Sequence, residues 1–338
     1  MSTRVNWGVL GTARIAEQQI VPAVSRSTNG RVLGLSSASG RAGTFAQNLG
    51  IPRAYNSHAA LLADPEIDAV YIPLPNALHS PWTIRAAAAG KHVLCEKPIA
   101  LNPDELTEME AAGVSAGVQI SEAFMYRYHP QIDRVRGMLA DGRIGEVRTI
   151  EARFHFLMDT SAGTDIRLDA NLGGGALRDL GCYPIDLMNL LLDAPPAEVA
   201  AVAVQPDSAG VEFTFAAALR YDTGVVGTFS CGFESPTMDH CMIVGTRGSI
   251  ELQHPFRADA NSGVIVVRTS SHSERIEVNG DAYLSEVEGF ARRILANAPD
   301  QGGVRLSRWT VATTYRLAQA ARLPGTSRQP SSTTAPRR

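Results

Sequence analysis

The sequence predicts an α/β protein in which a doubly wound parallel sheet is followed by an α+β domain with a large, mostly antiparallel open sheet. Two observations support this prediction. From residue 5 to residue 124, short apolar runs alternate with amphipathic stretches, which is typical of strands and helices in a parallel sheet. After residue 128, strand-like runs follow one another across turn residues instead of helices, which favours antiparallel pairing.

The first half of the chain alternates strands with helices. The strand-like segments are, in order, VNWGVLG, RVLGLSS, a short segment around Ala54, DAVYIPL, HVLCEKP and VQISEAF. Helices are predicted between them near residues 15–25, 42–49, 79–89 and 103–116. Because the connections are short, we expect residues 1–124 to form one domain around a parallel sheet.

The second half begins with a predicted helix near residues 131–140 and the run EVRTIEARFHF, in which apolar and polar residues alternate with the period of a half-buried strand. Further strand-like runs are AEVAAVAV, VEFTFAAALRYD, GVVGTFSCGF, CMIVGTRGSIEL and GVIVVRTS, and two helices follow at 282–297 and 307–322. We expect residues 125–323 to form the second domain, with a C-terminal helix as a candidate to pack back on the first. The polar, proline-rich tail, residues 324–338, is expected to be disordered.

Composition restricts the partners and the compartment. The chain has 338 residues and a formal net charge of -3, without a basic run, which argues against nucleic acid or an anionic membrane as a partner. No basic region followed by a long apolar stretch opens the chain, so we expect a cytoplasmic protein. The four cysteines and eight histidines form no metal-binding spacing, so no metal is expected. An open sheet has a second face to cover, which favours a homo-oligomer, a dimer or tetramer, formed through the C-terminal sheet.

The first strand-to-helix turn predicts a dinucleotide site. In GVLGTARIA, residues 8–16, Gly11, Ala13 and Ala16 take the small-residue places of the G-x-G-x-x-G/A turn. Such a turn brings backbone N–H groups close to a pyrophosphate held at the helix N-terminus, so Thr12, Arg14 and Ile15 of the same turn are also candidate contacts. The alternative is a helix start that needs small residues only for packing.

The end of the second strand bears on coenzyme choice. An acidic residue there would hold the ribose hydroxyls of NAD, but the sequence continues with Ser36, Ser37, Ala38, Ser39, Gly40 and Arg41. Hydroxyl groups and a guanidinium suit a 2'-phosphate, which favours NADP and leaves NAD possible. Arg41 could equally be a solvated residue in the first turn of a helix.

Two further strand ends carry polar groups that should reach the same edge of the sheet. The run PLPNALH contains Leu74, Pro75, Asn76 and His79 as candidate coenzyme contacts, with Asn76 alternatively a plain N-cap. The buried run HVLCEKP ends on Glu96 and Lys97 before a proline that cannot continue a strand. Ligand sites in open α/β sheets lie beyond the carboxyl ends of the strands, although a lysine could also simply reach solvent there.

The second domain contains one motif whose side chains could take part in a reaction, GGGALRDLGCYPID, residues 173–186. In a helix, the four-residue spacing would put Asp179 and Tyr183 on one face. Gly181 and Pro184 are poor helix formers, so we expect a short or kinked helix. The alternative is a loop and a helix start with a core tyrosine.

Apart from its tail, the chain resembles the glucose-fructose oxidoreductase and inositol dehydrogenase family, of Gfo/Idh/MocA type. The motifs that carry the resemblance are, in chain order, GVLGTARIA, PLPNALH, CEKP, EAFMYRYHP and GGGALRDLGCYPID. The lysine and tyrosine are similar to those of NADP-dependent xylose dehydrogenase and dimeric dihydrodiol dehydrogenase. The resemblance implies a Rossmann domain, Glu96 and Lys97 beside the nicotinamide ribose, and Tyr183 as the proton-transfer residue. It also implies Asp179 on the substrate hydroxyls or steadying that pair. Finally, it implies Arg127 and His129 near substrate.

Two departures from the family pattern are visible. Ala13 replaces a common glycine, and Ser37 stands where many NADP-using relatives carry arginine. Inositol dehydrogenases tend to have histidine where Tyr183 stands, which separates this chain from them.

The activity implied is an NAD(P)-dependent dehydrogenase acting on CH–OH groups, with oxidation of an aldose such as xylose or glucose at C1 as the main expectation. The alternatives are reduction of a keto group on a sugar nucleotide, oxidation of a trans-dihydrodiol, and a coenzyme-sensing regulator without turnover. A tyrosine base needs its pKa lowered from about 10, and we expect the Lys97 ammonium to lower the pKa of Tyr183.

Overall fold

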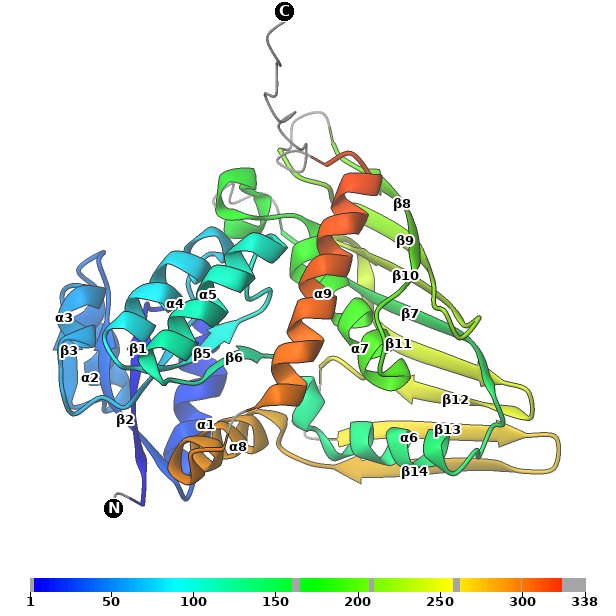
Figure 1. Ribbon diagram of the computed structural model, residues 1–338, viewed down its shortest axis with the longest axis horizontal. Coiled ribbons are helices and arrows are strands. Elements are labelled where there is room, and N and C mark those ends of the chain that lie inside the picture. The colour runs from blue at the N-terminus through cyan, green and yellow to red at the C-terminus, as the bar shows by residue number, and fades with distance from the viewer. Residues whose placement is uncertain (1–2, 160–164, 207–209, 258–261, 299, 324–338) are drawn as a thin grey trace, which may run out of the picture.

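The computed structural model describes residues 3–159, 165–206, 210–257, 262–298 and 300–323. These residues form two sheets that lie next to one another, with six strands and eight strands (Figure 1). The tail expected to be disordered, 324–338, lies outside the described residues.

The first sheet is parallel throughout and confirms the doubly wound prediction. Its order is β3-β2-β1-β4-β5-β6, so the chain reverses direction across the sheet between β1 and β4. Ligands of such sheets bind beyond the carboxyl ends of the strands at this reversal point. The strands are β1 (Val5–Leu10), β2 (Gly30–Ser36), β3 (Arg53–Tyr55), β4 (Ala69–Ile72), β5 (His92–Glu96) and β6 (Ile120–Ala123).

Helices and helical turns connect these strands close to the predicted positions. They are η1 (Ala16–Ile20), α1 (Val21–Arg26), α2 (Ala42–Leu49), α3 (His58–Leu62), η2 (Asn76–Leu78), α4 (His79–Ala88) and α5 (Pro103–Ala116). The sequence explains both ends of α5. Asn102 accepts from the Glu105 N–H at 2.9 Å as N-cap, and Gly117 ends the helix in the left-handed region. The five-residue helix α3 was not predicted, because it is too short to show a periodic pattern.

The second sheet has the order β14-β13-β12-β11-β7-β10-β9-β8, and every neighbouring pair is antiparallel except β7 with β10. The alternation predicted for β7 is confirmed, since Ile150, Ala152 and Phe154 are buried. The strand β14 was not predicted, because it contributes only two apolar side chains to the sheet. The strands are β7 (Val147–Leu157), β8 (Glu198–Val204), β9 (Thr214–Arg220), β10 (Val226–Gly232), β11 (Glu234–Gly245), β12 (Gly248–Gln253), β13 (Ser262–Thr269) and β14 (Ser273–Asn279).

Three helices cover one face of the second sheet. They are α6 (Pro130–Ala140), which contacts β13 and β14, α7 (Cys182–Leu192), which contacts β7, and α9 (Gln301–Ala320), which contacts β8. The helix α9 runs between the two sheets and also contacts α5 and β6 of the first (Figure 1). It therefore packs against both halves of the molecule.

The helix α8 (Ala282–Ala296) returns to the first sheet late in the chain. Its residues Val287, Phe290 and Ala291 are buried in the same cluster as Trp7 of β1, with the Trp7 and Phe290 ring centroids 5.5 Å apart. The core of the first sheet thus includes residues from both ends of the chain.

Candidate active site

The glycine turn after β1 has the conformation that dinucleotide binding requires. Gly11 has φ +120°, and its N–H donates to the Ser36 carbonyl at 2.9 Å. The backbone angle favours glycine, and a Cβ at this position would lie close to Leu74 Cδ2, at 3.2 Å. The Ala13 carbonyl accepts from the N–H groups of Ala16 and Glu17, which starts the helical segment directly after the turn. Ala13 is therefore the residue from which the helix begins.

The other residues of the turn differ in exposure. Arg14 is exposed, and its Nε donates to Gln18 Oε1 at 3.0 Å, while Thr12 and Ile15 are partly buried. The side chain of Arg14 thus lies along the surface of its own helix.

The serines at the end of β2 point in opposite directions. Ser36 is fully buried, with its Oγ 2.7 Å from His58 Nδ1, so its hydroxyl faces the interior. The side chain of Ser36 is thus used in an internal contact, and its contact with coenzyme stays a prediction. Ser37 Oγ lies 3.0 Å from Ser39 Oγ, which accepts from Arg41 Nε at 3.0 Å. Ser37, Ser39 and exposed Arg41 form a group of donors at the carboxyl end of β2.

The loop after β4 links the two domains. Asn76 Nδ2 donates to the Gly173 carbonyl at 2.8 Å, so its side chain reaches the second domain and does not cap its own helix. The ring of His79 is fully buried, with Nδ1 2.8 Å from the Pro98 carbonyl and Nε2 2.7 Å from the Leu74 carbonyl, so it bridges the loops that follow β4 and β5. Its contact with coenzyme stays a prediction. Burial lowers the pKa of His79 to about 4.

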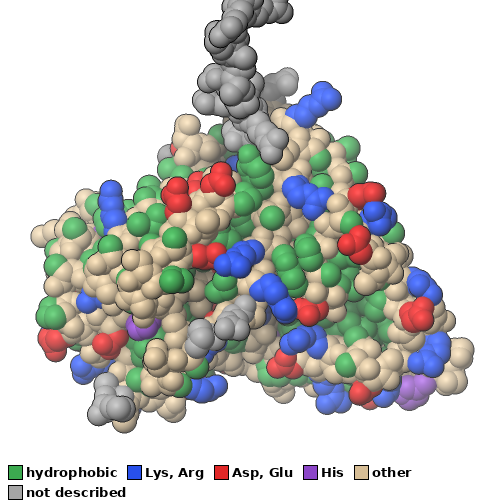
Figure 2. All heavy atoms as spheres, viewed as in Figure 1, with side chains coloured by type: hydrophobic (Ala, Val, Ile, Leu, Met, Phe, Trp, Pro, Cys, Tyr) green, Lys and Arg blue, Asp and Glu red, His purple; other side chains and the backbone are tan. Residues whose placement is uncertain are grey.

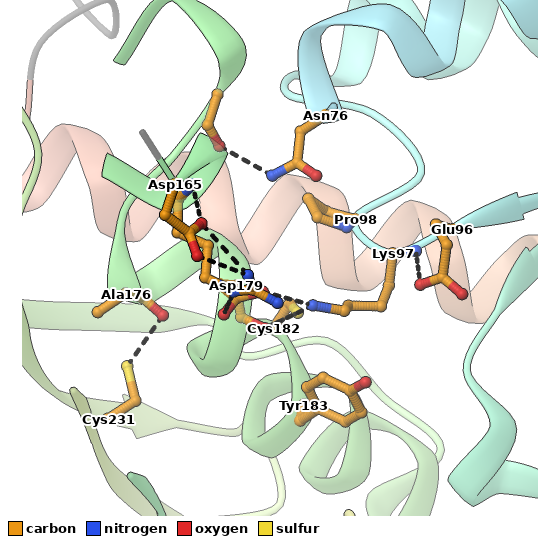
Figure 3. A network of polar contacts seen from close by, with 12 residues as sticks. Asn76, Glu96, Lys97, Pro98, Asp165, Ala176, Asp179, Cys182, Tyr183 and Cys231 are labelled. Atoms are coloured by element: carbon orange, nitrogen blue, oxygen red, sulfur yellow. Dashed lines mark hydrogen bonds and ion pairs between the residues drawn. The ribbon is translucent and has the colours of Figure 1, made fainter. Parts of the chain in front are cut away.

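Lys97 extends from the end of β5 to the second domain. Its Nζ donates at 2.8 Å to both Oδ1 and the carbonyl of Asp179, 82 residues away in sequence (Figure 3). Beside it, Glu96 Oε1 accepts from the Tyr71 hydroxyl at 2.5 Å. The side chains of Lys97 and Asp179 are 14% and 13% exposed, so the ion pair is largely shielded from water.

Tyr183 lies beneath the Lys97 ammonium. Lys97 Nζ is 5.3 Å from the centre of the Tyr183 ring, a distance suited to a cation–π contact (Figure 3). The ring is held edge-on by Phe124 and Phe154, each with centroids 5.2 Å away. The predicted kink is present as a π-helical turn, η6 (Leu177–Gly181), directly before α7. The structure therefore brings Lys97, Asp179 and Tyr183 together.

The charges of the site are fixed by these contacts. Burial alone would raise the pKa of Asp179, but Lys97 and Arg167 hold it at about 2. Burial alone would lower the pKa of Lys97, but the carboxylates of Asp179 and Glu96 help to raise it. The site thus contains a stable ammonium–carboxylate pair at neutral pH.

The expected lowering of the pKa of Tyr183 is wrong for the protein without ligands. Burial raises the pKa of Tyr183 well above its ordinary value. The Lys97 ammonium lies over the ring face, and its hydrogen bonds go to Asp179. Tyr183 is therefore a neutral phenol in this state.

Arg167 is a site residue that the sequence analysis missed. It lies in η4 (Ile166–Leu168), and its Nε donates to Asp179 Oδ2 at 2.8 Å while its Nη1 contacts Asp165 at 3.2 Å. Asp179 thus receives one cation on each carboxylate oxygen. The residue belongs to no recognisable motif, and only the folded chain brings it to Asp179.

Arg127 and His129 both make contacts within the protein. Arg127, in η3 (Met125–Tyr128), donates from Nε to Asp186 Oδ2 at 2.8 Å and makes a second bond to the same carboxylate. His129 is buried and caps α6, accepting from the Gln131 N–H at 3.2 Å. Both side chains thus make internal contacts, and their expected place near substrate stays a prediction.

Two other features of the described ranges bear on function. They contain no group of three or more His, Cys, Asp or Glu side chains arranged to hold a metal ion. They also contain no helix with the length and apolar character needed to cross a membrane.

Comparison with known proteins agrees with this geometry. Residues 5–124 match the model of the oxidoreductase family with an NAD-binding Rossmann fold, and residues 132–251 match the GFO/IDH/MocA C-terminal domain. D-xylose 1-dehydrogenase (NADP(+)) 2 of Haloferax volcanii is 37% identical over 297 residues, covering 85% of this chain and 88% of that protein. The mouse trans-1,2-dihydrobenzene-1,2-diol dehydrogenase is 34% identical over 246 residues, covering 72% and 69%.

A solved structure extends the match to the whole fold. The 3-ketoreductase of Actinomadura kijaniata, in complex with NADP and TDP-benzene, superposes with a TM-score of 0.88 at 30% identity, covering 94% of this chain and 98% of that one. The matching models, the identity to these relatives and the shared fold lead to one conclusion: the chain belongs to the GFO/IDH/MocA family of NAD(P)-dependent oxidoreductases.

Proposed function

We propose that this protein oxidises a free aldose of the xylose or glucose type at C1, with NADP as the coenzyme. The observation that carries the proposal is the meeting of Lys97, Asp179 and Tyr183 at the carboxyl edge of the parallel sheet. The similarity to an NADP-dependent xylose dehydrogenase supports the choice of substrate.

The residues at the sheet edge fit a nicotinamide dinucleotide. The turn from Gly11 to Ile15 would hold the pyrophosphate, and Glu96 would hold the ribose beside Lys97. Ser37 and Arg41 would hold a 2'-phosphate, since they are hydrogen-bond donors in a place where NAD enzymes carry a carboxylate. NAD remains the second coenzyme to test. When bound, the coenzyme supplies the hydride acceptor.

The side chains of the site transfer the proton and orient the substrate. Oxidation removes a hydride from C1 and a proton from its hydroxyl group, which leaves a carbonyl. We assign acceptance of the proton to the phenolate form of Tyr183, and the orientation of the hydroxyl oxygen to the Lys97 ammonium. Asp179 steadies Lys97 through two hydrogen bonds and is itself held by Arg167.

A second candidate is the reduction of a keto sugar, for example on a sugar nucleotide. The neutral state of Tyr183 favours it, because a phenol can donate a proton to the oxygen of a carbonyl as it is reduced. The match to a 3-ketoreductase solved with a TDP compound points the same way. Oxidation of a trans-dihydrodiol uses the same residues and is the third candidate.

The test follows nicotinamide absorbance with NADP and NAD against aldoses, polyols and trans-dihydrodiols, and in reverse with keto sugar nucleotides. We expect reduction of NADP with an aldose. Turnover only in the reverse direction would move the assignment to the ketoreductase. No change in nicotinamide absorbance with any substrate of the panel, with coenzyme still bound, would contradict the proposal and favour a coenzyme-sensing regulator.

We also propose that the protein is a cytoplasmic homo-oligomer, dimer or tetramer, formed through the outer face of the second sheet. Apolar side chains are exposed on that face: Val202, Val204, Val226, Met238 and Val244. On the face drawn in Figure 2, by contrast, acidic and basic side chains are interspersed. All four cysteines are buried free thiols, which suits a reducing compartment. Light scattering on the purified protein tests the subunit count.

A further inference from the structure

Three charged side chains are buried together behind the site: Glu122 of β6, Arg127 of η3 and Asp186 of α7. The side chains of Glu122 and Asp186 are 0% exposed and that of Arg127 is 11% exposed. A buried ion pair is weak evidence for stability, because the loss of hydration offsets much of the attraction. The arrangement therefore calls for an explanation in terms of geometry.

One end of this network holds the loop that carries Lys97. Glu122 Oε1 accepts from the Ile99 N–H at 3.0 Å, two residues after Lys97. Its other oxygen accepts from Ser307 Oγ of α9 at 2.6 Å and lies 3.5 Å from Arg127 Nη2. The position of the lysine loop is thus tied to Glu122.

The other end holds the helix that carries Tyr183. Asp186 lies three residues after Tyr183 on α7. It accepts two bonds from Arg127, one from the Tyr126 hydroxyl and one from Thr310 Oγ1 of α9 at 2.9 Å. Arg127 also stacks on Phe124, 4.6 Å from the ring centre, and Phe124 contacts the Tyr183 ring edge-on. Arg127 therefore bridges the two carboxylates and touches the aromatic residue that holds Tyr183.

We propose that Arg127 is a positioning residue. By bridging Glu122 and Asp186, it fixes the loop that carries Lys97 relative to the helix that carries Tyr183. The inference rests on the proposed function, since it assigns Lys97 and Tyr183 to the reaction. A planar guanidinium can bond both carboxylates at fixed angles, whereas a lysine ammonium acts as a single point charge. With Nε and Nη2 occupied, Arg127 has no need of substrate to satisfy its charge.

The first experiment is Arg127→Lys, with Arg308→Lys as the matched control. Arg308 also makes a multiple contact with a carboxylate, Glu110, between α9 and α5, but touches neither Lys97 nor Tyr183. We expect kcat of Arg127→Lys to fall about 10- to 100-fold, because a displacement near 1 Å can have an effect of that size. KM and the coenzyme Kd should stay within about threefold, and Arg308→Lys should keep all three constants. A rise in KM with unchanged kcat would instead make Arg127 a substrate contact and overturn the proposal.

The second experiment is chemical rescue. Arg127, Glu122 and Ser307 line a cavity of about 280 Å³, which gives small ions access to the network. Millimolar guanidinium should raise kcat of Arg127→Ala about tenfold, whereas sodium chloride at the same ionic strength should not. Equal effects of the two salts would contradict a geometric role. If Arg127→Ala does not fold, the lysine variant carries the test.

A crystal structure of Arg127→Lys with NADP gives a readout independent of turnover. We expect the separation of Lys97 Nζ from the Tyr183 ring centre to depart from 5.3 Å by about 1 Å. If the unaltered protein is inactive on every substrate, the proposed function fails, but this separation still tests the inference. An unchanged separation would refute the positioning role whatever the activity.

Discussion

Replacement of Asp179 by asparagine tests the ion pair at the centre of the site. The carboxylate receives Lys97 Nζ on one oxygen and Arg167 Nε on the other, each at 2.8 Å. Asparagine keeps the size and one acceptor oxygen but removes the charge. Lys97 then loses its charged partner and keeps only neutral acceptors, among them the backbone carbonyl of residue 179.

The pKa of Asp179 sets the magnitude. A fall from 3.8 to about 2 is about 1.8 pH units, and at about 1.36 kcal/mol per unit this is about 2 kcal/mol of stability. Breaking a buried pair can cost about 3 to 5 kcal/mol when a charge is left uncompensated, so we expect a loss of about 2 to 4 kcal/mol for Asp179→Asn. Because the folded-state pKa is lowered, this stabilisation is complete above pH 3.8 and is lost as the pH falls toward about 2.

The assay is urea unfolding of the coenzyme-free protein at several pH values, together with steady-state kinetics. The control is Asp165→Asn, which also removes a partner of Arg167 but touches no atom of Lys97. Asp165 is 35% exposed, so its loss should cost less than about 1 kcal/mol. We expect kcat to fall about 100-fold in Asp179→Asn and to stay near normal in the control. Equal, small effects of the two substitutions on stability and kcat would refute the reasoning.

Three further outcomes are expected. Tyr183→Phe should lower kcat about 10²- to 10⁴-fold with coenzyme affinity retained in a fluorescence titration, and near-normal turnover would exclude Tyr183 as the proton-transfer group. Because burial raises the pKa of Tyr183, the phenolate is scarce at neutral pH, so kcat/KM for alcohol oxidation should rise about tenfold per pH unit between about pH 7 and 9; a flat profile would point to another base. Arg41→Ala should weaken NADP about 10- to 100-fold by calorimetry and leave NAD unchanged, whereas equal loss for both would remove Arg41 from the 2'-phosphate site.

The fold could be predicted well because its signals are periodic. Alternation of strands and helices gave the parallel sheet, and alternation of apolar and polar residues in the run around Ile150 gave a strand of the second sheet. Helix α3 and strand β14 lack such a signal, since the first is only five residues long and the second has few apolar residues. Their formation depends on neighbouring elements that the local sequence does not reveal.

The site could be predicted only as far as chain direction determines it. The ends of β1 and β5 had to lie at one edge of a parallel sheet, so the location of Gly11 and Lys97 at this edge could be predicted. The expectation that Arg127 lies near substrate came from the family resemblance alone, because spacing does not say which way a residue of an irregular turn points. The contact of Arg167 with Asp179 could not be predicted, because only the tertiary fold brings the two residues together. The strand period could have shown that Ser36 and Ser37 point in opposite directions, because neighbours on a strand face opposite sides.

The return of α8 to the first sheet has a consequence for biosynthesis. When residues 1–124 leave the ribosome, the side of β1 that bears Trp7 still lacks part of its cover, because Val287, Phe290 and Ala291 are not yet translated. Domains that fold early in synthesis normally do so with their own apolar surface enclosed. This N-terminal half must instead wait, partly uncovered, for the last sixth of the chain. A fragment ending before residue 282 should therefore be prone to aggregate even though every strand of its first sheet is present.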